Sequence, residues 1–182
     1  DPIQEVATTN FLLAYHGKND RDLQMKAAQF YEHACPSLGY IAAHCRSPKP
    51  LNGRIKVGFI SRYMYGHSIG KTTRGVLANL NRERFEVWAL FAPPFCDDDI
   101  SRFIRANAHG HVILPLSLDA ARQRIEALEL DILFYQDIGM DPFTYFLAFS
   151  RLAPVQCTSF GHPVTSGIRN LDYYISTEFW EP

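Results

Sequence analysis

The chain has 182 residues, of which 47% are hydrophobic and 13% aromatic, so it holds enough apolar side chains for a packed core and is not disordered. This length leaves room for one full domain and a short additional segment. The formal net charge of −1 at pH 7 gives no indication of a nucleic-acid or acidic-membrane partner.

Four cysteines are scattered along the chain without the paired C-x-x-C spacing of a zinc or redox site. This usage is typical of reduced thiols and predicts a cytoplasmic protein. No apolar run has the length of a membrane-spanning helix, and the first residues lack the pattern of a signal peptide. Both ends interrupt a secondary-structure pattern, which suggests that the natural chain continues beyond them.

Residues 1–46 have helical periodicity, which predicts two helices that precede the main domain. Candidate helix caps in this part are Thr8, Thr9 and Asp20. Residues 47–53 contain two prolines and a glycine, which mark a boundary. We therefore divide the chain into a helical segment, residues 1–50, and a second domain, residues 51–182.

After this boundary, apolar runs alternate with helical patterns. The predicted strands are residues 54–61, 85–91, 111–114, 131–135, 155–160 and 171–176. The predicted helices are residues 68–80, with Ser68 as cap, 99–107, 118–128, with Ser117 as cap, and 142–151, with Pro142 in the first turn. This alternation predicts an α/β domain with a mostly parallel sheet covered by helices on both faces. The order of the strands cannot be read from the sequence.

One strand ends in residues that suit a ligand site. Val155–Phe160 has the pattern of a buried strand, Gly161 allows a sharp turn, and Pro163 prevents further strand pairing. The residues that follow, Thr165, Ser166 and Gly167, offer hydroxyl and N–H groups. In open α/β sheets, ligands bind where strands end in this way. The alternative is an ordinary connection between two strands.

The exit of the first predicted strand contains a candidate catalytic residue. Residues 62–67 lead into the helix that starts at Ser68, and His67 lies one residue before this predicted cap. A histidine at such a place titrates near neutral pH and can move a proton, although an ordinary surface histidine would look the same. We expect His67 and Gly161 to open onto one groove.

A phosphate-binding loop is the alternative interpretation of the same segment. Gly66 and Gly70-Lys71-Thr72 resemble the G-x-x-x-x-G-K-[ST] pattern but are one residue too close together. Asp137 follows the fourth predicted strand and would face the crevice, whereas Asp141, before Pro142, suits a helix cap.

Three blocks together resemble the protein O-linked N-acetylglucosamine transferases and their bacterial, SPINDLY-like relatives. They are Arg54–Ser61 with Gly66-His67-Ser68, Asp131–Asp141, and Arg151–Gly167 with Asp172-Tyr173. Residues 9–13 also resemble the linker that follows the tetratricopeptide repeats in that family.

The resemblance implies a GT-B glycosyltransferase with two Rossmann-like lobes, which inverts the sugar configuration and needs neither a metal nor another cofactor. Residues 1–50 would be the helical linker and residues 51–182 the N-terminal lobe. The C-terminal lobe, with a lysine that offsets the diphosphate charge, would lie outside this sequence, so the chain alone would be inactive. The partners implied are a nucleotide sugar, UDP-linked, and a protein acceptor with a free hydroxyl.

The resemblance also assigns site residues. His67 would border the reacting centre as a base or as a positioner of substrate. Phe160, Gly161, His162 and Pro163 would lie near the donor sugar and diphosphate, with Thr165 and Ser166 close by. The bulky loop Tyr63-Met64-Tyr65 is more similar to bacterial members, whose sugar donors and acceptors vary. Members of the wider group use N-acetylglucosamine, glucose or fucose donors. A non-catalytic Rossmann-like binding module is the other alternative.

Overall fold

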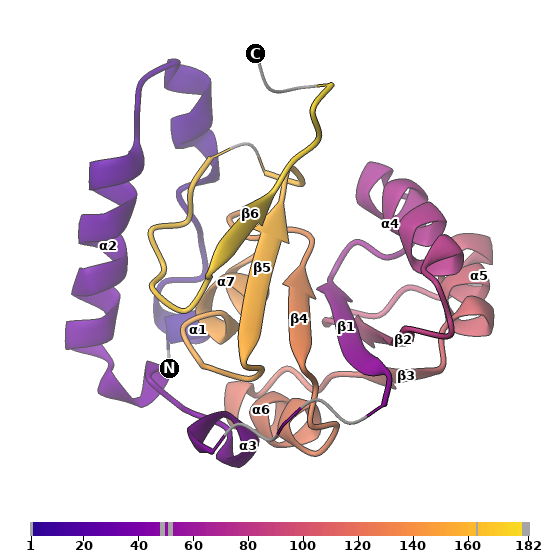
Figure 1. Ribbon diagram of the computed structural model, residues 1–182. Helices are drawn as coiled ribbons and strands as arrows, with labels where there is room; N and C mark the ends of the chain where they lie inside the picture. Colours follow the sequence, from indigo (N-terminus) through magenta and orange to yellow (C-terminus); the bar gives the residue numbers. More distant parts are fainter. Residues whose placement is uncertain (1, 48–49, 51–52, 163, 180–182) are drawn as a thin grey trace.

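The computed structural model describes residues 2–47, 50, 53–162 and 164–179. In this part of the chain, six strands form one sheet in the order β3-β2-β1-β4-β5-β6 (Figure 1). The strands are β1 (Ile55–Ser61), β2 (Phe85–Phe91), β3 (Gly110–Ile113), β4 (Ile132–Tyr135), β5 (Val155–Ser159) and β6 (Tyr173–Ile175). Every neighbouring pair is parallel, so the carboxyl ends of these strands meet at one edge. The predicted α/β class is therefore confirmed, and the sheet has a Rossmann-like strand order.

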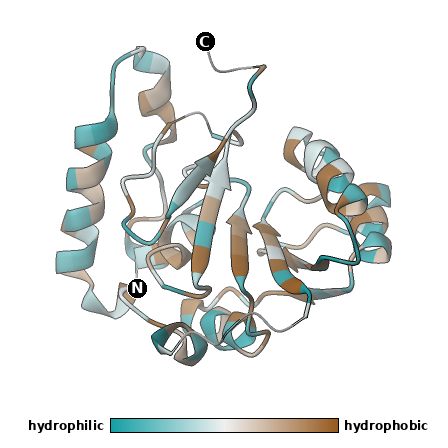
Figure 2. Cartoon of the chain, viewed as in Figure 1, coloured by the Kyte–Doolittle hydropathy of each residue, from teal (hydrophilic) through white to brown (hydrophobic). Residues whose placement is uncertain are grey.

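Helices cover the sheet because most of its strands carry apolar residues on both faces. The core beneath α4 (Ser68–Asn79) and α5 (Asp99–Asn107) contains Val57 and Phe59 of β1, whereas Ile60 joins the core beneath α6 (Leu118–Glu126) and α7 (Pro142–Leu147). This alternation is the two-residue period of a strand. Figure 2 shows hydrophobic residues concentrated on the central strands and a largely hydrophilic helix at one side of the sheet.

That hydrophilic helix, α2 (Arg21–Ala34), lies beyond the β6 side of the sheet (Figure 1). The other elements of the N-terminal segment are α1 (Pro2–Glu5), the 3-10 helices η1 (Phe11–His16) and η2 (Pro36–Leu38), and α3 (Ala43–Arg46). The ring of Tyr31 packs edge-on against Phe146 of α7, with 5.2 Å between centroids. The Ala42 N–H also donates to the Arg151 carbonyl at 2.9 Å. The helical segment therefore shares one hydrophobic core with the sheet.

The predicted bounds of β2 and α5 are confirmed, and Ser117 caps α6 as expected. The helix predicted to reach residue 151 instead ends at Leu147. The residues that follow form tight turns, in which N–H groups donate to carbonyl oxygens three or four residues earlier. Thr9 does not cap η1; its hydroxyl donates to the Gly139 carbonyl at 2.5 Å, so a tertiary contact replaces the local one. None of the helices in the described ranges has the length and apolar character needed to cross a bilayer.

Candidate functional site

The strand order creates a switch point between β1 and β4, since β2 and β3 lie on one side of β1 and the later strands on the other. At such a point the connections leave the sheet towards opposite faces, and a crevice opens at the carboxyl edge. Three loops meet this edge: residues 62–67 after β1, residues 136–141 after β4, and the segment that begins at Phe160 after β5. The exits that carry His67 and Gly161 therefore share one edge, with a single strand between them.

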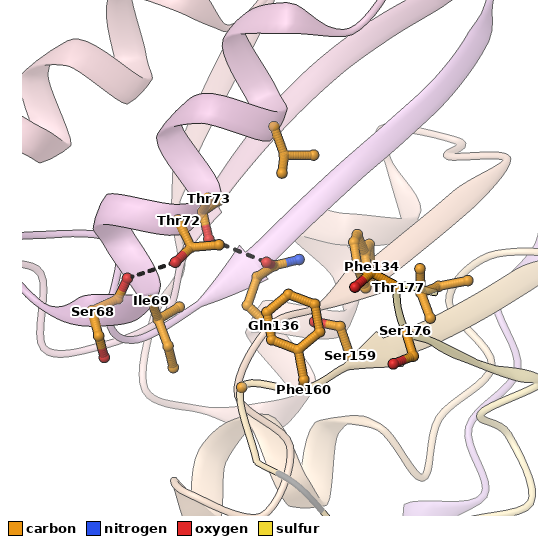
Figure 3. A pocket seen from close by; sticks show the side chains of 13 residues that line it. Ser68, Ile69, Thr72, Thr73, Phe134, Gln136, Ser159, Phe160, Ser176 and Thr177 are labelled. Atoms are coloured by element: carbon orange, nitrogen blue, oxygen red, sulfur yellow. Dashed lines mark hydrogen bonds between the residues drawn. The ribbon is translucent and has the colours of Figure 1, made fainter. Parts of the chain in front are cut away.

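A pocket of about 400 Å³ opens between the first turns of α4 and the ends of β4, β5 and β6 (Figure 3). Its walls are largely apolar and include the rings of Phe134 and Phe160. Hydroxyl groups from both sides reach it, for example those of Ser68 on α4 and Ser159 on β5. Ser68 and Gly161 both line this pocket, so the start of α4 and the β5 exit are brought together around one cavity, whereas His67 and the rest of the loop 62–67 are not among the residues that line it.

The amide of Gln136 lies within this pocket and joins β4 to α4. Its Oε1 accepts a hydrogen bond from the Thr73 hydroxyl at 3.1 Å (Figure 3). Its Nε2 is buried and has no protein partner among the described residues. An unpartnered buried amide nitrogen costs free energy, so the Thr73 bond holds the Gln136 side chain in place at the price of one unsatisfied N–H group.

His67 is the N-cap of α4, which corrects the prediction that Ser68 has this role. Its Nδ1 accepts a hydrogen bond from the Ile69 N–H at 3.2 Å. A nitrogen that accepts from an N–H group must carry a lone pair, so in the neutral ring the proton is on Nε2. In this arrangement the neutral His67 ring offers an Nε2–H donor to another group rather than a second free lone pair.

The loop before His67 is held at several points. The His67 ring packs on the Tyr63 ring, with 4.7 Å between centroids. The Gly66 N–H donates to the Asp98 carboxylate at 2.6 Å. Gly70 lies so close to the Tyr65 backbone that any Cβ would overlap the Tyr65 carbonyl oxygen. Position 70 therefore requires glycine, because the loop approaches α4 too closely there to leave room for a side chain.

Asp137 is fully buried at the exit of β4, beside the exit of β1. Its Oδ2 accepts hydrogen bonds from the Ser61 hydroxyl at 3.1 Å and from the Arg62 N–H at 3.0 Å. Burial raises the pKa of Asp137 to about 7, and the nearby Asp141 carboxylate contributes to this rise, whereas the hydrogen bonds to Arg62 and Ser61 oppose it.

Asp141 caps α7, as predicted, since its Oδ1 accepts from the Phe143 N–H at 2.9 Å. Its Oδ2 pairs with the Arg62 guanidinium at 2.6 Å. This ion pair ties the loop after β1 to the start of α7 and compensates the charge of a carboxylate that is almost fully buried.

Gly161 and Phe160 line the pocket, in agreement with their position at a strand exit. A Cβ at Gly161 would overlap the carbonyl oxygen of Gln136 and would lie 3.5 Å from Ile69 Cδ1 of α4. The backbone of Gly161 does not have a positive φ. Glycine is therefore required by close packing against the β4 exit rather than by a left-handed conformation.

The structure places the other predicted substrate-binding residues away from this pocket. His162 is buried; its Nε2 lies 3.2 Å from the Phe11 carbonyl oxygen and its ring packs on the Phe11 ring at 4.8 Å. Burial lowers the pKa of His162, although the Phe11 carbonyl partly offsets this effect. Thr165 and Ser166 border a separate groove beside α2, and their hydroxyls accept from backbone N–H groups two residues later. Pro163 lies outside the described residues.

The segment that resembles a phosphate-binding loop is part of α4. Gly70, Lys71 and Thr72 lie in the first turns, and the Lys71 N–H donates to the His67 carbonyl within the helix. Its amide is thus unavailable to wrap a phosphate. A search of the described ranges finds no group of three or more His, Cys, Asp or Glu side chains arranged to hold a metal ion.

The sequence did not single out three residues that shape the site. Asp98 holds Gly66 from α5, Gln136 enters the pocket, and Ser61 links the β1 exit to Asp137. The polar residues Ser61 and Gln136 at the ends of buried apolar strands were a usable signal, since such positions face the carboxyl edge. Asp98 gave no such signal, because its role depends on the approach of α5 to another loop.

No protein-family model matches this chain, and the search of curated proteins gave no match. Among solved structures, a mutant of the O-GlcNAc transferase from Thermobaculum terrenum is similar, with a TM-score of 0.73 and 24% sequence identity. The similarity covers 85% of this chain and 29% of that structure, so the chain spans less than a third of the transferase. The chain therefore has the α/β fold of part of an O-GlcNAc transferase, in agreement with the resemblance of the three sequence blocks.

Proposed function

We propose that this chain is the N-terminal lobe, residues 51–182, and the preceding helical linker, residues 1–50, of a nucleotide-sugar-dependent protein glycosyltransferase. The observation that carries this proposal is the carboxyl edge at the switch point, where the start of α4, which follows the β1 exit, and the β5 exit enclose one pocket. The fold similarity to an O-GlcNAc transferase supports it. The completed enzyme would need a second lobe, which is where the resemblance to that family puts most of the nucleotide site.

Inverting transfer needs an acceptor hydroxyl in line with the sugar carbon, a proton acceptor, and donors that stabilise the departing diphosphate. In this chain, His67 presents an Nε2–H group, because its Nδ1 caps α4. We assign to it the role of a positioner that donates to a substrate oxygen. To act as a base at Nδ1 it would first have to give up the Ile69 N–H.

The neutral donors of the pocket suit a sugar and not a free metal ion. Hydroxyl groups such as those of Ser68 and Ser159 can bond sugar hydroxyls or a carbonyl group. The rings of Phe134 and Phe160 supply the apolar walls on which a sugar face packs. The proposed reaction is metal-independent, with a nucleotide-linked donor, UDP-N-acetylglucosamine, UDP-glucose or GDP-fucose, and a protein hydroxyl as acceptor.

The test uses the full-length protein. Isothermal titration against UDP- and GDP-sugars identifies the donor, and transfer of the labelled sugar to protein acceptors measures activity. We expect His67→Ala to lower transfer about 100-fold, which is the scale of lost substrate positioning. The matched control is His111→Ala, because His111 lies on β3 away from the pocket. Absence of nucleotide-sugar binding would refute the proposal and favour a non-catalytic binding module.

A further inference from the structure

The β1 exit depends on a buried carboxyl group that the proposed reaction does not itself use. Asp137 is 0% exposed. Its Oδ2 accepts the hydrogen bonds from the Ser61 hydroxyl and the Arg62 N–H, at the point where the loop begins. The Ser61 hydroxyl, which donates to Asp137, in turn accepts from the Tyr63 N–H at 2.8 Å. A chain of hydrogen bonds therefore runs from Asp137 through Ser61 to the residue on whose ring His67 packs.

The rest of the loop continues this chain in short steps. The Tyr65 N–H donates to the Tyr63 carbonyl at 2.8 Å, and the His67 N–H donates to the Tyr65 carbonyl at 2.6 Å. Each backbone turn thus takes its position from the one before it. A shift of Tyr63 would move both the backbone and the ring contact of His67.

A second carboxylate, that of Asp98 at the start of α5, holds the same loop at Gly66 and provides a comparison. Asp98 accepts from the Gly66 N–H at 2.6 Å and from the Ser101 N–H at 2.8 Å. Burial opposes its ionisation, but the hydrogen bonds from Ser101 and Gly66 outweigh this effect, and its pKa is lowered. Asp98 therefore stays ionised throughout the neutral range, whereas Asp137 does not.

We propose that Asp137 is the positioning residue for His67 and that its ionisation regulates the order of the His67 loop. This inference rests on the proposed function only for its effect on transfer. An ionised carboxylate is a stronger acceptor than a neutral one, so the loop is held more firmly when Asp137 has lost its proton. Because the pKa of Asp137 is about 7, this change falls within the physiological range.

The groups around Asp137 determine how sharply it titrates. Arg62 and Tyr63 belong to the loop after β1, Tyr135 belongs to β4, and Asp141 lies at the start of α7. The Arg62 guanidinium is paired with Asp141 at 2.6 Å, so it is not fully available to neutralise Asp137. The Tyr63 and Tyr135 phenols have raised pKa values, chiefly through burial, and stay neutral in this range.

The experiment follows the His67 ring by NMR in full-length protein labelled at histidine, with the signal assigned from a His67→Gln variant. We expect the wild-type ring signals to show, in addition to the protonation of the ring itself, a second one-proton transition near pH 7 that disappears in Asp137→Asn. Asn keeps an oxygen for Ser61 and Arg62 but cannot ionise. Asp98→Asn is the matched control, and it should retain the transition.

Transfer activity separates this inference from the proposed function. We expect Asp137→Ala to lower the transfer rate about 100-fold with donor affinity unchanged, and Asp137→Asn to recover most of the rate. The pH dependence assigned to Asp137 should be absent in the Asn variant. If the His67 signals respond to Asp137 but no sugar is transferred, the proposed function fails and the positioning role stands. An unchanged transition in Asp137→Asn, or wild-type transfer by Asp137→Ala, would overturn the inference.

Discussion

The strongest consequence for stability concerns the buried carboxyl of Asp137. The pKa of an unfolded aspartate is about 4, whereas that of the folded group is raised to about 7. Between these values the folded state binds more protons than the unfolded state, so the free energy of unfolding falls as the pH rises. Above about pH 7 both states are ionised, and the cost of burying the charge is fully present.

The expected size follows from the same two pKa values. Between about pH 5 and about pH 8, Asp137 should lower the free energy of unfolding by about 3 kcal/mol. Asp137→Asn removes this contribution, because the amide cannot ionise. The free energy of unfolding of the variant minus that of the wild type should therefore rise by about 3 kcal/mol from about pH 5 to about pH 8. This expected change does not depend on which protein is more stable at about pH 5.

Urea denaturation of both proteins at the two pH values measures the difference. Contributions from all other groups cancel when the variant is compared with the wild type at each pH. Asp98→Asn is the control, because the pKa of Asp98 is lowered and its carboxylate is therefore ionised at both pH values. Its effect on the free energy of unfolding should not depend on pH in this range. A pH-independent difference between Asp137→Asn and the wild type would show that the group ionises normally, and the reasoning would be refuted.

Three further predictions concern the loops around the pocket. His67→Ala should lower the free energy of unfolding by about 1 kcal/mol through loss of the α4 cap, whereas His67→Asn should retain the cap; equal thermal denaturation of the two variants would contradict this role. Gly161→Ala should destabilise the protein by about 1–3 kcal/mol, because the new methyl group overlaps the Gln136 carbonyl, and wild-type stability in chemical denaturation would exclude that approach. Phe11→Ala should raise the pKa of His162 towards its ordinary value by exposing the ring, as measured by NMR titration; an unchanged pKa would mean that Phe11 does not bury it.

The α/β class was predictable because each buried strand is a short apolar run between helical patterns. Phe85–Phe91 shows this well, since the run has clear flanks and the strand has the expected bounds. The strand order was not predictable, because no local pattern records which strands become neighbours. The expected length of α7 was wrong for a related reason: its apolar sequence continues, but packing tightens the chain into turns after Leu147.

Part of the candidate site was also predictable. Parallel strands end at one edge, so polar or glycine residues after strands, such as His67 and Gly161, could be assigned to that edge, although only Gly161 lines the pocket. Side-chain direction was beyond reach: Gly161 lines the pocket, while His162 turns towards Phe11, which is 151 residues away in sequence. Ser68 was the better statistical cap for α4, but His67 has that role because its Nδ1 accepts the Ile69 N–H.

The central claim is that the β1 and β5 exits together form part of a nucleotide-sugar site. The most direct measurement is an NMR titration of the full-length protein with UDP-N-acetylglucosamine, UDP-glucose and GDP-fucose, which follows the His67 ring and the Gly161 amide. The account predicts that one of these donors shifts both signals with a common saturation curve. If donors bind and neither signal moves, or if none of the donors binds, the account is contradicted.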